Sequence, residues 1–173
     1  MDNADIVFYI GHGNGGGFTF ESNHDDGNLT YTDAAGAWGD IDLEWLALLS
    51  CEVLKADYGG QRWWQRWGPS FDGLHLLLGF ETNAHDWPAF GGTFADWTLG
   101  KHIGPFILPA MPVRLSWFLA KAEQQPAADI AVAMGVIGPA GLSNYNDYFW
   151  GKGPVGPDVR GGDIHGYWRV TFQ

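Results

Sequence analysis

The feature that most constrains the fold is a set of short apolar runs that stop abruptly at polar or small residues. The first run, DIVFYIG at residues 5–11, is rich in β-branched and aromatic side chains, a pattern typical of a strand buried on both faces. Similar runs occupy residues 45–51 and 74–80, although the leucines and alanines of residues 45–51 leave a helix as a competing interpretation. Residues 128–137 resemble another strand, and the alternation in residues 167–172 predicts a strand with one solvated face.

Stretches with helical periodicity separate these runs. Residues 61–71 place several aromatic side chains on one helical face, with Arg66 pointing away from it. Two further helices are expected, one over residues 90–99 and one within residues 112–126, a segment that begins and ends with proline. Strands alternating with helices predict an α/β fold with a mainly parallel sheet flanked by helices. The length of 173 residues fits a single domain spanning residues 1–173.

Residues capable of chemistry follow three of the expected strands. The first apolar run leads into His12, the second ends at Cys51, and the third is followed by Glu81, Asn83 and His85. In parallel sheets ligands bind beyond the carboxyl ends of the strands, so we expect these residues to collect on one rim. On that rim, the last three residues would line a substrate pocket, with a solvated loop as the alternative.

His12 and Cys51 together can perform nucleophilic catalysis. A thiol attacks as the thiolate, and an adjacent imidazole can take its proton and later protonate a leaving amine. The backbone N–H groups of Gly13 and Cys51 would bind the developing oxyanion. A buried, unreactive thiol is the structural alternative, because free cysteine often behaves as a small hydrophobic residue.

The two strand ends carry a resemblance to a known group. FYIGHG at residues 8–13 and LLSC at residues 48–51 resemble, in order and placement, the catalytic blocks of the caspase-like cysteine peptidases, which include caspases, legumain, gingipain and separase. The wider segments 43–51 and 73–83 are similar to an uncharacterised bacterial family thought to share that fold.

The resemblance implies a fold, a reaction and a set of roles. The fold would be a caspase-like three-layer sandwich. His12 would act as general base and acid and Cys51 as nucleophile, and a peptide or protein substrate would be hydrolysed through a thioester. This reaction requires no metal and no organic cofactor.

The start of the chain departs from the caspase-like pattern. Such domains place two strand and helix units before the His-Gly strand, whereas here that strand begins almost at Met1. The sheet would lack its first strand and helix units, and its edge near residues 5–11 would be uncovered. Three explanations compete: a fragment or misassigned start, a second copy or another chain covering the edge, and a reduced fold without activity.

The rival function is therefore a non-catalytic interaction subunit. A third interpretation is a carbohydrate-binding or carboxylate-based hydrolytic domain.

Composition excludes several classes of partner. The net charge is 9 − 20 = −11, which repels the phosphate backbone of nucleic acids. No apolar run approaches the roughly 18 residues of a membrane span, and no basic segment follows Met1. We therefore expect no nucleic acid partner, no membrane insertion, and a cytoplasmic location if Met1 is the true start.

Three other polar features allow narrower predictions. His75 lies inside an apolar run and is expected to be a core histidine with satisfied hydrogen bonds. Glu81 is a candidate counter-charge for a basic substrate side chain. His24, Asp25 and Asp26 match no metal-binding spacing, which favours a polar loop tip.

Overall fold

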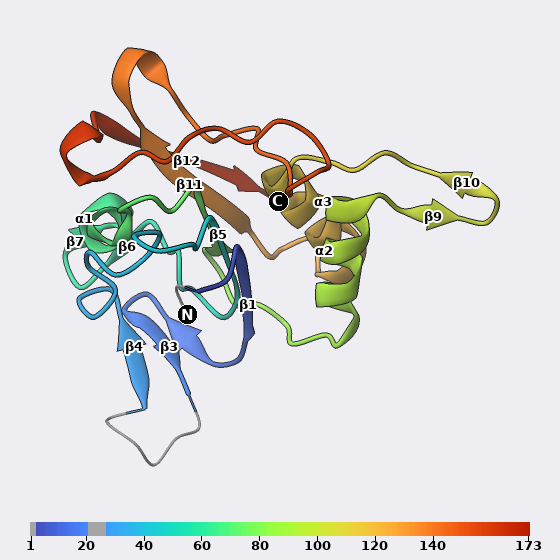
Figure 1. Ribbon diagram of the computed structural model, residues 1–173. Coiled ribbons are helices and arrows are strands. Elements are labelled where there is room, and N and C mark those ends of the chain that lie inside the picture. The colour runs from blue at the N-terminus through green and yellow to red at the C-terminus, as the bar shows by residue number, and fades with distance from the viewer. Residues whose placement is uncertain (1–2, 21–26) are drawn as a thin grey trace.

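A computed structural model describes residues 3–20 and 27–173 and shows a mixed α/β fold (Figure 1). Its centre is a five-stranded sheet with the strand order β1-β5-β8-β11-β12. These strands are β1 (Ile6–Ile10), β5 (Trp45–Leu49), β8 (Leu76–Phe80), β11 (Ala131–Ile137) and β12 (Gly166–Phe172). All five lie on the apolar runs described above. The positions of the strands are therefore confirmed, and the helix alternative for residues 45–51 is wrong. The prediction that β1 is buried on both faces is also wrong: none of its five residues is fully buried, because β1 lies at the edge of the sheet.

The sequence predicted a mainly parallel sheet, but the observed sheet is mixed. Strands β1, β5 and β8 are parallel neighbours, whereas β11 runs antiparallel to both β8 and β12. Two helices connect β8 to β11, and the chain after them returns to the end of the sheet at which β8 terminates. The N–H of Glu81 donates to the carbonyl of Ile130 there (2.9 Å), so β11 starts beside the end of β8 and runs back.

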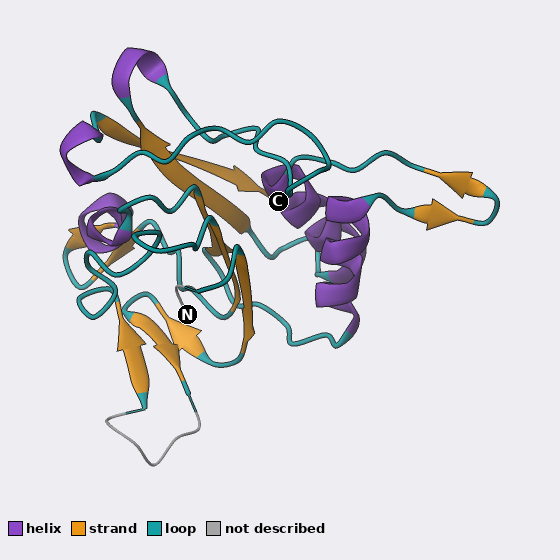
Figure 2. Cartoon of the chain, in the orientation of Figure 1, coloured by secondary structure: helices purple, strands orange, loops and turns teal. Residues whose placement is uncertain are grey.

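Helices lie on both faces of the sheet (Figure 2). They are α1 (Trp63–Trp67), continued by the 3₁₀ helix η1 (Gly68–Ser70), α2 (Ala89–Leu99) and α3 (Val113–Gln124). Alternate residues of each strand face opposite layers, as the two-residue period of a strand requires. Trp45 and Leu49 pack with Trp117 of α3, and Leu46 packs with Trp67 of α1. The central strands β5, β8 and β11 are therefore buried on both faces.

Helix α1 differs from its prediction. It is much shorter than residues 61–71, and the side chain expected to point outward, Arg66, is fully buried. The guanidinium of Arg66 donates to the carbonyl of Lys55 and lies over the ring of Tyr58 (5.9 Å). Trp64, expected on the buried face, is 46% exposed. The loop before the helix covers the arginine, an arrangement that helical periodicity does not encode.

Short elements complete the fold. They are β2 (Gly13–Asn14), β3 (Gly17–Thr19), β4 (Asn28–Thr30), β6 (Asp57–Tyr58), β7 (Gln61–Arg62), β9 (His102–Ile103), β10 (Phe106–Ile107), η2 (Pro139–Gly141) and η3 (Gly161–Asp163). The hairpin of β9 and β10 projects from the body next to α2 (yellow in Figure 1). Among residues 3–20 and 27–173, we find no helix with the length and apolarity that a membrane crossing requires.

Candidate active site

Strands β1 and β5 bring the two sequence-predicted catalytic residues to the same end of the sheet, where both strands terminate. The strands are parallel and in register, with Ile10 opposite Leu49. His12 lies two residues after Ile10, and Cys51 lies two residues after Leu49. Neighbouring strands lie about 4.8 Å apart, so the two chain segments leave the sheet side by side.

A direct packing contact joins the two strand ends. A β-carbon built on Gly13 would lie 2.1 Å from Oγ of Ser50 and 2.9 Å from the carbonyl oxygen of Gly17. Only glycine fits between these two neighbours. The His-Gly and Ser-Cys blocks therefore touch through Gly13 and Ser50.

The backbone N–H groups of Gly13 and Cys51 are available to a ligand. Thr19 N–H donates to the His12 carbonyl (3.0 Å), so the alternation of an antiparallel ladder makes the Gly13 position a non-hydrogen-bonded pair. The N–H of Gly13 consequently faces away from β3. The ladder between β1 and β5 ends with Gly11 N–H donating to Leu49 (3.2 Å). Among the described residues, the N–H of Cys51 makes no backbone hydrogen bond.

The backbone of His12 is fixed while its side chain is exposed. Its carbonyl accepts hydrogen bonds from Thr19 N–H (3.0 Å), Thr19 Oγ1 (3.3 Å) and the Tyr9 hydroxyl (3.3 Å). The imidazole is exposed and, within the part of the chain that the structure describes, makes no hydrogen bond or ion pair. Both ring nitrogens therefore remain open to a substrate or a thiol.

The thiol of Cys51 is half-buried under the segment that follows β8. Ala84 N–H lies 3.4 Å from Sγ, and Sγ lies 3.5 Å from the Ala84 carbonyl oxygen. The sulfur is therefore held against the N–H and the carbonyl oxygen of one residue. Ala84 was not among the residues predicted from the sequence, since an alanine carries no side-chain chemistry.

The chain turns sharply directly after the thiol. Glu52 has φ of 54°, in the left-handed region that residues other than glycine rarely adopt. Its N–H donates to the Thr82 carbonyl (2.8 Å), and its carboxylate pairs with Lys55 (2.8 Å). These contacts hold the turn in its costly conformation. Such strain concentrates at functional sites, where it fixes a reactive side chain.

The structure places the three predicted rim residues differently from one another. Glu81 is paired with Arg169 of β12 (2.7 Å), so its carboxylate already has a cationic partner. His85 Nδ1 lies 3.0 Å from Oδ2 of Asp129, and Asn83 is exposed. The segment does reach the thiol, but through Ala84.

A hollow of about 610 Å³ adjoins the imidazole. Its lining comprises Tyr9, Ile10, Gly11, His12, Thr19 and Phe20. Cys51 is not part of this lining. The hollow therefore offers room for a ligand next to the imidazole of His12.

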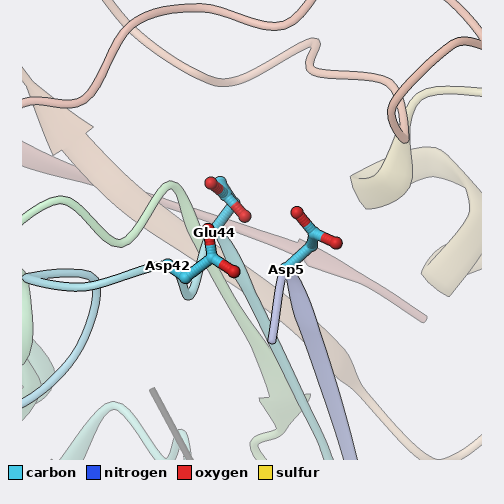
Figure 3. Close-up of side chains that lie close together, drawn as sticks. All are labelled: Asp5, Asp42 and Glu44. Atoms are coloured by element: carbon cyan, nitrogen blue, oxygen red, sulfur yellow. The ribbon is translucent and has the colours of Figure 1, made fainter. Parts of the chain in front are cut away.

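A group of carboxylates that sequence reasoning missed lies at the opposite end of the same strands. Asp5 precedes β1 and Glu44 precedes β5, and Figure 3 shows them next to Asp42. One carboxylate oxygen from each lies within 4.8 Å of the others, a spacing suited to a cation. Burial raises the pKa of Glu44 to about 7; His75 opposes the shift, and the nearby carboxylates Asp5 and Asp42 add to it. The signal in the sequence was an acidic residue directly before each of two strands.

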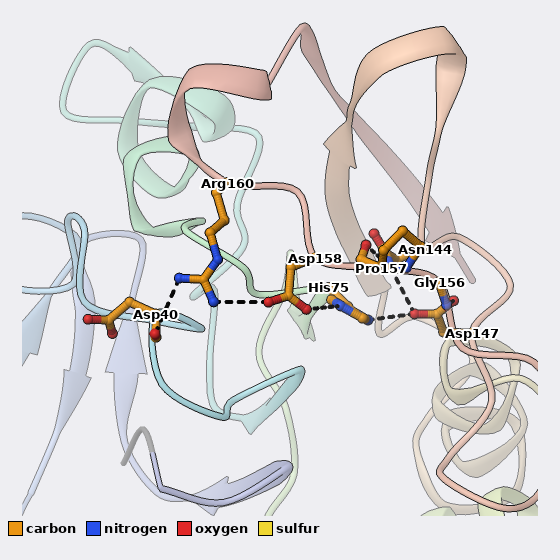
Figure 4. A network of polar contacts seen from close by, with 8 residues as sticks. All are labelled: Asp40, His75, Asn144, Asp147, Gly156, Pro157, Asp158 and Arg160. Atoms are coloured by element: carbon orange, nitrogen blue, oxygen red, sulfur yellow. Dashed lines mark hydrogen bonds and ion pairs between the residues drawn. The ribbon is translucent and has the colours of Figure 1, made fainter.

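His75 is a core histidine with both ring nitrogens engaged, as predicted (Figure 4). Its Nδ1 lies 2.6 Å from Oδ2 of Asp147, and its Nε2 lies 3.3 Å from Oδ1 of Asp158. Arg160 donates to the other oxygen of Asp158 (3.0 Å). The imidazole therefore ties the long loop before β12 to the start of β8. The predicted loop tip at residues 24–26 lies outside the described residues.

The fold and the site define a mixed α/β domain in which an exposed imidazole and a half-buried thiol follow the carboxyl ends of two neighbouring parallel strands. The chain belongs to the family described as Domain of unknown function (DUF6345), whose match covers residues 1–172 and so includes both blocks. No curated protein and no solved structure matches the chain.

Proposed function

We propose that the protein is a cysteine peptidase that hydrolyses peptide bonds with Cys51 and His12. The observation that carries this proposal is the register of β1 and β5, which brings the two strand-terminal blocks together at Gly13 and Ser50. The resemblance of both blocks to caspase-like peptidases supports it. In this proposal the sheet with helices on both faces is a caspase-like three-layer sandwich.

The reaction would proceed in two balanced steps. His12 takes the proton of the Cys51 thiol, and the thiolate sulfur attacks the carbonyl carbon of the substrate amide. The N–H groups of Gly13 and Cys51 stabilise the oxyanion that forms. As the intermediate collapses, the carbon–nitrogen bond breaks, and His12 gives its proton to the leaving amine. Water, deprotonated by His12, then attacks the thioester and releases the acid and the thiol.

Cleavage of a capped peptide library, read by mass spectrometry, tests this function. The proposal expects new amino termini with the native chain and none with Cys51→Ala or His12→Ala. Cleavage that persists in Cys51→Ala would indicate a carboxylate-based hydrolase instead. A folded native chain that cleaves nothing and whose Cys51 reacts with iodoacetamide no faster than in the denatured chain would refute the peptidase proposal.

A further inference from the structure

Strand β1 exposes a complete set of backbone hydrogen-bonding groups. It is the outermost strand, and within residues 3–20 and 27–173 no other strand pairs with its outer side. The Asp5 carbonyl accepts from β5, and Gly11 N–H donates to β5. Because successive residues of a strand alternate, Ile6, Phe8 and Ile10 direct their N–H and C=O groups away from β5. An unpaired edge of this kind is a template for another extended segment.

An apolar groove runs along the same edge. Its volume is about 360 Å³, and it lies between Ile6 and Phe8 of β1, Phe94 and Leu99 of α2, and Phe149. Phe8 is 36% exposed and Leu99 is 46% exposed. Large apolar side chains therefore remain in contact with water directly beside the free backbone groups.

Three carboxyl groups that have no ion-pair partner among the described residues adjoin the Ile6 end of this groove. Asp5 directly precedes Ile6, and its carboxylate lies with those of Asp42 and Glu44 in the group described above (Figure 3). None of the ion pairs among the described residues involves these three carboxylates. The raised pKa of Glu44 reflects burial and this crowding. A cationic side chain placed there would relieve the repulsion.

We propose that the outer edge of β1 binds an extended segment of a partner protein, which adds to the sheet as a further strand. The segment places an apolar side chain in the groove of Phe8, Phe94 and Leu99, and a lysine or arginine among Asp5, Asp42 and Glu44. Backbone pairing supplies the affinity, and the groove and the carboxylates supply the specificity.

The charge pattern favours a basic partner over a second copy of this chain. Each copy carries a net charge of −11, so two copies repel each other. Antiparallel pairing of two β1 strands would place Asp5 of one copy against the Ile10 end of the other and would leave the carboxylates without a cation. The far end of the edge leads to the hollow beside His12. The docking itself requires neither His12 nor Cys51.

Amide hydrogen exchange by NMR tests the proposal in the full chain carrying Cys51→Ala, which removes any cleavage. The probes are pools of capped peptides of about eight alternating valines and threonines, with arginine, glutamine or glutamate at either end. We expect the arginine pools to protect the amides of Ile6, Phe8 and Ile10 on binding. The amides of Val7 and Tyr9 face β5 and serve as internal controls that stay unchanged.

Affinity measurements by calorimetry separate the two recognition elements. We expect arginine pools to bind about tenfold more tightly than glutamate pools, and Asp5→Asn to reduce that preference. Leu99→Asp should abolish binding, whereas Ile107→Asp, on the exposed β9–β10 hairpin, should not. Peptides N-methylated at alternate amides lack the N–H donors that backbone pairing with β1 needs. They therefore test this pairing without altering the protein.

Three results would overturn the proposal. The first is no protection of the outer amides with any pool. The second is equal affinity for arginine and glutamate pools. The third is a stable dimer of the free chain in which the amides of Ile6, Phe8 and Ile10 are protected before any peptide is added.

Discussion

The packing of Gly13 against Ser50 allows a quantitative test of the geometry of the site. In Gly13→Ala, the new β-carbon would lie 2.1 Å from Ser50 Oγ, and real β-carbons essentially never approach another atom within 3.0 Å. Ser50 is 1% exposed, so its hydroxyl cannot move into solvent. Overpacking of this kind costs about 1–3 kcal/mol of unfolding free energy. For a chain of this length the midpoint of thermal unfolding should fall by about 2–12 °C.

A double-mutant cycle identifies the neighbour responsible. Ser50 Oγ is buried and has no hydrogen-bond partner among the described residues, so Ser50→Ala alone should change stability by less than about 0.5 kcal/mol. In the double variant the 2.1 Å contact is gone, although the Gly17 carbonyl oxygen at 2.9 Å remains. Part of the loss should therefore be recovered, with a coupling energy of about 1 kcal/mol.

Urea denaturation followed by tryptophan fluorescence measures all four chains of this cycle. The dependence of the unfolding free energy on urea concentration should be the same for all four chains, which would confirm that only stability changes. Losses that add to within about 0.3 kcal/mol would show that the two strand ends do not touch. A Gly13→Ala chain with native stability would contradict the packing outright.

Two further predictions concern titratable groups away from the candidate dyad. The pKa of Glu44 is raised from 4.5 to about 7, so its contribution to stability is full below pH 4.5 and is lost as pH rises through 7. Glu44→Gln should flatten this decline in urea melts across the pH series, and an unchanged slope would contradict the assignment. His75→Ala leaves the Asp147 carboxylate buried without its ring partner and should cost about 3–5 kcal/mol in the same assay. A loss below about 1 kcal/mol would show that the pair is unimportant.

The sequence predicted the strands and the position of the candidate dyad because both depend on local patterns. A run of apolar residues that stops at His12 or Cys51 locates the carboxyl end of a strand. The family match covers both blocks but assigns no activity to them. The strand ends were therefore predictable, and the reaction remains a proposal.

Contacts between distant segments were not predictable in this way. Arg169 pairs with Glu81 across 88 positions of sequence, which removes the free counter-charge expected at Glu81. The antiparallel direction of β11 depends on the connection through two helices. The apolar pattern of a strand does not show whether the strand pairs parallel or antiparallel to its neighbour. The carboxylates of Asp5 and Glu44 precede their strands, whereas the rule that ligands bind beyond the carboxyl ends of strands points to the opposite end of the sheet.

The reactivity of the single cysteine tests the central claim most directly. Iodoacetamide labelling at about pH 6, followed by mass spectrometry, reports on Cys51 alone, because the chain has no other thiol. We predict that Cys51 in the native chain reacts faster than in the denatured chain, and that His12→Gln removes this advantage while leaving the fold intact. A native rate equal to the denatured rate, or a fast rate that survives in His12→Gln, would contradict a thiol activated by the imidazole.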